Sequence, residues 1–285
     1  MVPKELHLGT ANFAMPYGIA NKSPMKPMEA KEILNWCKGR IECIDYAPEY
    51  KGAAELLTEF CGSYRVTTKV DFSSFKTAHQ LEKQLMSQLV TMKLQRFNHV
   101  LVRFSREYFP IHQDFWGVLQ DLKASGYCES LGFSVYQPSD VLQAINVFTS
   151  IDIFQVPENL LNRKFSEFAT SHPHLSNQVK FVVRSIFLQG LFFMKQDEIP
   201  SNLAPLIPSL IQLQKEAMKQ ECSLTDLAIA YSKQLTWSSG TVIGVNSLEQ
   251  AKSTYQAFQD SRNRSFEFLH DLKTLPEELT DPRSW

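Results

Sequence analysis

The sequence predicts an α/β protein that folds as a closed (β/α)8 barrel, a single domain over residues 1–285 with a short C-terminal extension. Short β-rich runs alternate with amphipathic helical stretches along the whole chain, which indicates a parallel sheet covered by helices. Eight such units fit a closed barrel better than an open sheet. No linker, low-complexity tract or shift in composition marks a second domain.

The individual elements follow from apolar spacing and from the residues that end helices. Ile33, Leu34 and Cys37 recur as one helix face would require, and Gly126 suits a helix C-terminus. The expected strands cover residues 6–12, 41–45, 64–70, 99–104, 129–135, 151–156, 179–186 and 240–245. The expected helices cover residues 27–37, 53–60, 78–92, 115–124, 139–147, a long region 204–235 with a fresh N-cap at Ser223, and 247–258.

Composition excludes several classes of protein. The formal net charge is −1, with 29 basic and 30 acidic residues and no long block of like charge, which argues against nucleic-acid or membrane partners. The most apolar stretch, residues 179–194, is too short to span a membrane and contains Lys180 and Arg184. The five cysteines are scattered without a CxxC pair, so we expect reduced thiols, no metal site and a cytoplasmic location.

Polar residues end several of the apolar strands. In a (β/α)8 barrel the chemistry is located at the C-terminal ends of the strands, where loops from different strands converge. The residues expected at this mouth are Asp45, Lys69, Arg103, Ser134, Gln155, Arg184 and the region of Gly244.

An ordered series of segments resembles the aldo-keto reductase family. These segments are residues 8–13 (LGTANF), 44–50 (IDYAPEY) with Glu55, 67–69 (TTK), 132–134 (GFS), 155–159 (QVPEN), 184–190 (RSIFLQG) and 242–247 (VIGVNS). Each segment alone is weak evidence for the resemblance, but together the segments cover nearly the whole chain in order. Residues 17–21 and 281–285 are most similar to a bacterial branch associated with surface-sugar biosynthesis.

This resemblance implies hydride transfer between NADPH, or alternatively NADH, and a carbonyl compound. By similarity Tyr50 is the proton donor, Lys69 lowers its pKa from the usual value of about 10, and Asp45 orients Lys69. An Asp at one strand end, a Tyr five residues later and a Lys at the next strand end can also be expected to converge on physical grounds. The plainer alternative is that Asp45 and Lys69 form only an ion pair at the barrel rim.

Strand four departs from the family pattern, because Arg103 stands where the family usually has a catalytic histidine. His99 should lie at the opposite end of that strand and does not substitute for it. Arginine is always charged and presents several donors that suit carboxylates and phosphates. Arg103 therefore has three interpretations: an electrophile in a working reductase, an anchor for an acidic substrate, or the mark of a site that binds without catalysis.

The expected cofactor residues match the family pattern at some positions and depart from it at others. The resemblance implies that Ser134 and Gln155 hold the nicotinamide carboxamide, with Val135 in place of the family's asparagine. Arg184 replaces an aromatic residue that stacks on the nicotinamide, and a salt bridge within the mouth is its alternative role. The turn at the start of the last barrel helix suits a pyrophosphate. Its residues and the nearby side chains expected to contact the nucleotide are Gly244, Val245, Asn246, Ser247, Gln250 and Lys252.

Two classes of function remain open from the sequence. The first is an NAD(P)H-dependent oxidoreductase that reduces a small, sugar-like or acidic carbonyl compound. The second is a catalytically impaired barrel that binds a nicotinamide nucleotide or an acidic ligand without turnover. A weaker third option is cofactor-free chemistry on an acid. The oligomeric state is left open, with a monomer favoured.

Overall fold

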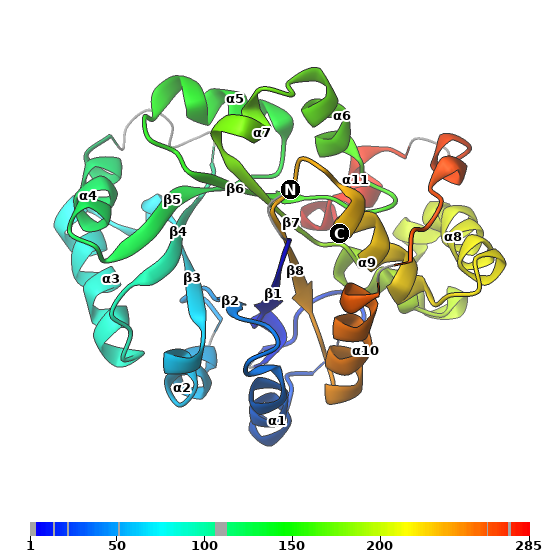
Figure 1. Cartoon of the computed structure of the whole chain (residues 1–285), viewed down its shortest axis with the longest axis horizontal. Helices are drawn as coiled ribbons and strands as arrows, with labels where there is room; N and C mark the ends of the chain where they lie inside the picture. The colour runs from blue at the N-terminus through cyan, green and yellow to red at the C-terminus, as the bar shows by residue number, and fades with distance from the viewer. Residues whose placement is uncertain are drawn as a thin grey trace.

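The computed structural model describes residues 4–13, 15–21, 23–50, 52–105, 113–260, 262–272 and 275–285. Within these ranges the strands form a closed parallel barrel in the order β1 to β8, with helices arranged around it (Figure 1). The predicted (β/α)8 barrel is confirmed. The strands are β1 Glu5–Gly9, β2 Cys43–Asp45, β3 Arg65–Val70, β4 Phe97–Arg103, β5 Cys128–Ser134, β6 Ile153–Pro157, β7 Lys180–Arg184 and β8 Gly240–Gly244.

The helices mostly follow the predicted positions. The helical region expected over residues 204–235 begins as a 3-10 segment η7 (Ser201–Leu206) and continues as α8 and α9, and the chain turns between α8 and α9, just before the predicted N-cap at Ser223, with Glu221 at a φ of 50°. Two helices between β6 and β7, α6 and α7, were not predicted. The helices are α1 Pro27–Cys37, α2 Ala53–Thr58, α3 Ala78–Thr91, α4 Gln113–Ala124, α5 Pro138–Val147, α6 Lys164–Ser171, α7 Leu175–Gln178, α8 Ile207–Lys219, α9 Leu224–Gln234, α10 Leu248–Gln259 and α11 Glu277–Thr280.

Local sequence explains where the helices begin. The Ser223 hydroxyl accepts a hydrogen bond from the Asp226 N–H at 3.1 Å, and the Asp226 carboxylate accepts one from the Ser223 N–H at 2.9 Å, a reciprocal cap that begins α9 as predicted. Ser247 caps α10 in the same way, accepting from the Gln250 N–H at 3.1 Å. These caps fix where the loops above strands β7 and β8 end.

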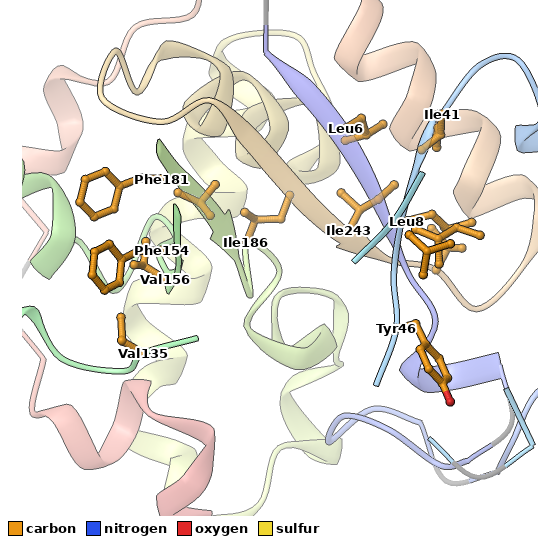
Figure 2. Close-up of a cluster of buried hydrophobic side chains, with 14 of the residues drawn as sticks. Leu6, Leu8, Ile41, Tyr46, Val135, Phe154, Val156, Phe181, Ile186 and Ile243 are labelled. Atoms are coloured by element: carbon orange, nitrogen blue, oxygen red, sulfur yellow. The ribbon is translucent and has the colours of Figure 1, made fainter. Parts of the chain in front are cut away.

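The barrel closes because β1 pairs in parallel with both β2 and β8. Side chains alternate along each strand, so every second residue points into the barrel and the others face the helices. One inward layer consists of Leu101, Ile153 and Val182, packed with Val242. The outward residues form a much larger cluster between strands and helices, including Leu6, Leu8, Phe154, Phe181 and Ile243 (Figure 2).

A single glycine sets the spacing between β5 and β6. Gly132 is paired with Ile153, and a Cβ atom added at Gly132 would lie 1.7 Å from the Ile153 carbonyl oxygen. That contact is with backbone, which cannot turn aside as a side-chain end would. The two strands can therefore approach this closely only with glycine at this position.

Glu158, a buried acid directly after β6, forms hydrogen bonds with two helices. The Glu158 carboxylate is fully buried and accepts hydrogen bonds from Ser166 Oγ at 2.5 Å, Tyr231 Oη at 2.6 Å and the Phe165 N–H at 3.2 Å. Burial raises the pKa of Glu158 to about 7, in spite of these donors. Glu158 thus connects the segment after β6 to α6 and α9.

We predict that Gly132→Ala lowers the free energy of unfolding by roughly 3 kcal/mol or more, because the new methyl group displaces the β6 backbone. Urea denaturation followed by circular dichroism measures this change. Gly117→Ala in α4 is the matched control, since a Cβ atom there meets no neighbour within 4 Å. Equal stability of the two variants would contradict the close approach of β5 and β6.

We also predict a pH dependence of stability that comes from Glu158. Its pKa in the folded chain, about 7, lies above the ordinary value of 4.5. The proton is therefore bound more tightly in the folded state, and the stabilisation is complete below pH 4.5 and is lost as the pH rises through about 7. Relative to Glu158→Gln, the natural chain should lose on the order of 3 kcal/mol of unfolding free energy across this range. Denaturation curves of both proteins that shift in parallel with pH would exclude this account.

Candidate active site

A cavity of about 520 Å³ opens at the C-terminal ends of the barrel strands, a volume suited to a small-molecule ligand. The structure brings most of the predicted site residues together around it. Those that line the cavity are Asp45, Tyr50, Lys69, Arg103, Ser134, Gln155, Arg184, Gly244, Asn246 and Gln250. Val245, Ser247 and Lys252 do not line it: Val245 is buried, Ser247 caps α10, and Lys252 is exposed.

A buried polar network forms the floor of this cavity. The Lys69 ammonium donates to Asp45 Oδ1, and Gln155 Nε2 donates to Asp45 Oδ2 at 2.7 Å. All three residues are at most 4% exposed. Burial lowers the pKa of Lys69, and the Asp45 carboxylate opposes that change. The predicted link between Asp45 and Lys69 is therefore present, and it extends to Gln155.

Gln155 has one polar atom left over. Its Oε1 is buried and has no hydrogen-bond partner among the described residues. A buried acceptor without a partner costs free energy, so such atoms call for a donor from a ligand or water. Gln155 and the neighbouring Ser134 both line the cavity, at the ends of paired strands β5 and β6.

Tyr50 lies beside this network on the loop between β2 and α2. Its ring is half-buried and meets Tyr46 edge to face, with 6.4 Å between ring centres. No hydrogen bond joins Tyr50 to Lys69 among the described residues, although both line the same cavity.

The expected lowering of the Tyr50 pKa is not found. Burial and, next, the Asp45 carboxylate raise the pKa of Tyr50, while Arg103 and Arg184 oppose this rise. The main reason is that burial disfavours the charged phenolate, and the carboxylate of Asp45, which pairs with Lys69, adds to the rise. A raised pKa keeps Tyr50 protonated at neutral pH.

Arg103 ends β4 at the cavity wall. Its Nη2 donates to Glu49 Oε2 at 3.1 Å, and its side chain is 35% exposed. The Nε atom is buried and has no hydrogen-bond partner among the described residues. His99 lies four residues earlier on the same strand, where its Nδ1 pairs with Thr67 Oγ1 at 2.9 Å, and it is not part of the cavity lining.

Arg184 contacts Tyr136 and Val135, and these contacts differ from both of the roles expected for it. Its guanidinium lies over the Tyr136 ring, 4.3 Å from the ring centre, and its Nη2 donates to the Val135 carbonyl at 3.1 Å. Arg283 from the C-terminal segment also lies over Tyr136, at 3.7 Å. The C-terminal residues therefore reach the rim of the cavity through Tyr136.

The rim near β8 is organised by Asn246, which was predicted as a nucleotide contact, together with Asn12, which was not predicted as a site residue. Asn12 donates to the Val245 carbonyl at 3.1 Å and to Asn246 Oδ1 at 2.6 Å. Gln250 Oε1 accepts from the Asn246 N–H at 2.8 Å, so this part of the expected pyrophosphate turn is already paired within the protein. The position of Asn12 just after the first strand was the one available signal for it.

Two loops approach each other at the cavity mouth. Gly18 has a φ of 86°, and a Cβ atom there would lie 2.7 Å from the Gln189 carbonyl oxygen. Tyr17, Tyr136 and Phe193 also line the cavity and were missed by sequence reasoning. Aromatic residues on loops carry no periodic signal that would single them out.

Comparisons with known proteins agree with this architecture. Residues 5–265 match the aldo/keto reductase family. The holo form of an aldo-keto reductase from Bacillus halodurans superposes with a TM-score of 0.75 at 16% identity, over 99% of this chain and 95% of that one. A glycerol dehydrogenase from Gluconobacter oxydans gives 0.70 at 18% identity, over 93% and 90%.

A putative aldo-keto reductase from Pseudomonas aeruginosa gives a TM-score of 0.64 at 15% identity, over 89% of this chain and 88% of that one. No curated protein sequence matches the chain. None of the helices that the structure describes has the length and hydropathy of a membrane span.

A closed parallel barrel with a polar cavity at the C-terminal ends of its strands defines a (β/α)8 protein with a candidate small-molecule site. The chain belongs to the aldo/keto reductase family, whose members generally use NAD(P)H and act on small carbonyl compounds.

Proposed function

We propose that this protein is an NAD(P)H-dependent reductase of a small carbonyl compound, sugar-like or acidic, with Tyr50 as proton donor and NADPH as the expected nucleotide. The observation that carries the proposal is the buried Asp45–Lys69–Gln155 network at the floor of a cavity that Tyr50 and Arg103 also line. A site of this shape and charge suits an oxygen that gains negative charge during the reaction.

The residues present fit a nicotinamide. Gln155 Oε1 is a buried acceptor without a partner, and a carboxamide amino group is a donor that would satisfy it. Ser134 would contact the same carboxamide, and Arg184 would lie near the ring. Gly244, Asn246 and Gln250 would lie along the phosphates. When bound, the reduced nicotinamide supplies the hydride.

The protein's own residues would then complete the reduction. As the carbonyl carbon accepts the hydride, Tyr50 Oη gives its proton to the carbonyl oxygen, which becomes an alcohol. The raised pKa keeps Tyr50 protonated until that moment. Lys69 and Arg103 stabilise the resulting tyrosinate, and solvent returns the proton.

Arg103, in the place of the family's histidine, favours a substrate that carries an anionic group. Lys69 is paired with the buried Asp45. Arg103 is paired only with the exposed Glu49, keeps a buried Nε without a partner among the described residues, and has a side chain that is 35% exposed. A carboxylate next to the carbonyl would accept from it. A sugar acid combines both features, and it agrees with the resemblance to a branch associated with surface-sugar biosynthesis.

One observation favours the alternative function, ligand binding without turnover. Tyr50 makes no hydrogen bond with Lys69, and its pKa is raised rather than lowered. In this alternative the cavity retains a nicotinamide nucleotide or an acidic ligand, and Arg103 serves only to bind it.

We predict that NADPH quenches the tryptophan emission of the purified protein with saturation, and that NADH does so more weakly. Gln155→Leu should weaken NADPH binding roughly 10-fold, because the carboxamide loses its buried partner. Gln178→Leu, at the exposed end of α7, is the matched control and should bind as the natural protein does. Absence of binding by both nucleotides would refute the proposal.

We further predict that Arg103→Met raises KM for 2-oxo acids and sugar acids by about 10- to 100-fold and changes KM for neutral aldehydes little, since one charge-assisted hydrogen bond is lost. Steady-state kinetics on matched acidic and neutral substrates measures this difference. A uniform loss on both would rule out an anchor for the acid. Arg103→His should instead raise turnover of neutral aldehydes if Arg103 only replaces the usual electrophile.

Tyr50→Phe is the control for chemistry in the same assay. It removes one hydroxyl and should abolish turnover while leaving NADPH binding intact. Nucleotide binding without any turnover by the natural protein, over acidic and neutral substrates alike, would favour the binding function.

A further inference from the structure

The opposite, N-terminal end of the barrel contains a second polar cluster. Glu5 and His7 alternate along β1, so both face the same side of the strand, and His7 is paired with Cys43 on β2. Their side chains meet inside the base of the barrel: His7 and Cys43 lie two residues before the strand ends that border the cavity, and Glu5 lies four residues before the end of β1. None of the three lines that cavity.

The three ligand atoms lie close together. Glu5 Oε2 lies 3.6 Å from His7 Nε2 and 3.6 Å from Cys43 Sγ, and all three atoms lie within 4.8 Å of one another. In a tetrahedral zinc site with ordinary bond lengths, neighbouring ligand atoms are about 3.3 to 3.5 Å apart. The two distances from Glu5 Oε2 are close to this spacing, and the third, between His7 Nε2 and Cys43 Sγ, is at most 4.8 Å and would shorten as the ion binds.

His7 adds an independent observation. Its side chain is 2% exposed, and Nε2 is buried without a hydrogen-bond partner among the described residues. Space is kept beside this atom by Gly240 on β8, because a Cβ atom there would lie 3.0 Å from His7 Nε2. A buried imidazole nitrogen that faces a carboxylate and a thiol is a suitable metal ligand.

The surrounding groups complete the charge balance. Arg65 Nη2 donates to the other carboxylate oxygen, Glu5 Oε1, at 2.9 Å, which leaves Oε2 directed at His7 and Cys43. Asn98 Nδ2 approaches Cys43 Sγ at 4.0 Å and would support a thiolate. Carboxylate and thiolate together neutralise a divalent ion.

We propose that Glu5 Oε2, His7 Nε2 and Cys43 Sγ form a binding site for Zn²⁺ at the base of the barrel, with solvent as the fourth ligand. The mixed oxygen, nitrogen and sulfur donor set is typical of zinc. Water reaches the site on the side of Glu5, whose side chain is 42% exposed. The proposed site departs from the expectation of no metal, which rested on the absence of a CxxC pair, because its ligands come from two strands and leave no CxxC spacing in the sequence.

Metal binding would tie β1 to β2 by coordinate bonds. In the metal-free chain burial raises the pKa of Cys43 to about 12, and its thiol donates to Glu5. Coordination deprotonates the thiol, so one proton is released as the ion binds. The ion would then stabilise the folded chain by mass action, and the melting temperature would rise with zinc concentration.

Cobalt substitution tests the proposal on the full-length, tag-free protein after treatment with a chelator. We expect one Co²⁺ per chain, with a thiolate-to-cobalt charge-transfer band and the strong visible absorption of tetrahedral cobalt, both removed by one equivalent of Zn²⁺. Cys43→Ser should abolish the charge-transfer band, and His7→Gln should weaken binding roughly 100-fold or more. Zinc should raise the melting temperature of the natural protein and not that of either ligand variant.

Cys128→Ser is the matched control, because Cys128 is a buried cysteine at the N-terminal end of β5 and should leave the cobalt spectrum unchanged. A spectrum without the charge-transfer band, or a band that persists in Cys43→Ser, would overturn the proposal. Should either ligand variant fail to fold, the cobalt spectrum and stoichiometry of the natural protein decide the question alone.

Discussion

Closure of the barrel is the constraint on which the rest of the structure depends. The pairing of β1 with β8, from Glu5 with Gly240 to Gly9 with Gly244, fixes the register of the entire ring. Because side chains alternate, that register decides which residues face inward at every level. Gly132 shows how closely the barrel strands pack, since β5 and β6 approach closely enough to exclude even a methyl group.

The polar mouth exists at an energetic cost that the packing around it must offset. Two charges at Asp45 and Lys69 are almost entirely removed from water, and their attraction alone does not repay the loss of hydration. Gln155 contributes a further hydrogen bond to the carboxylate, and Arg103 has its own partner in Glu49. Such an arrangement stabilises the fold little, which agrees with the proposed role of the network in holding fixed charges near a ligand.

Sequence reasoning located the barrel and the strand-end residues because both depend on local signals. An apolar run ending in Asp45 or Lys69 is visible in one chain, and the parallel fold places such ends together. The Tyr50 pKa depends on burial and on the charges of Asp45, Arg103 and Arg184, which come together only in the folded barrel. Tyr136 and Asn12 were missed for the same reason, since their contacts with Arg283 and Asn246 join opposite ends of the chain. Helices α6 and α7 are short, and neither has an extended apolar period.

The shortness of β2 has a consequence of its own. Its three residues are an inward thiol, an outward aliphatic side chain and an inward carboxylate: Cys43, Ile44 and Asp45. Inserting or deleting one residue here would exchange the faces, forcing Ile44 into the polar interior and turning both Cys43 and Asp45 toward the helices. One three-residue strand, β2, therefore supplies side chains to both ends of the barrel. Substitutions within β2 keep this arrangement, whereas a change in its length would alter both ends at once.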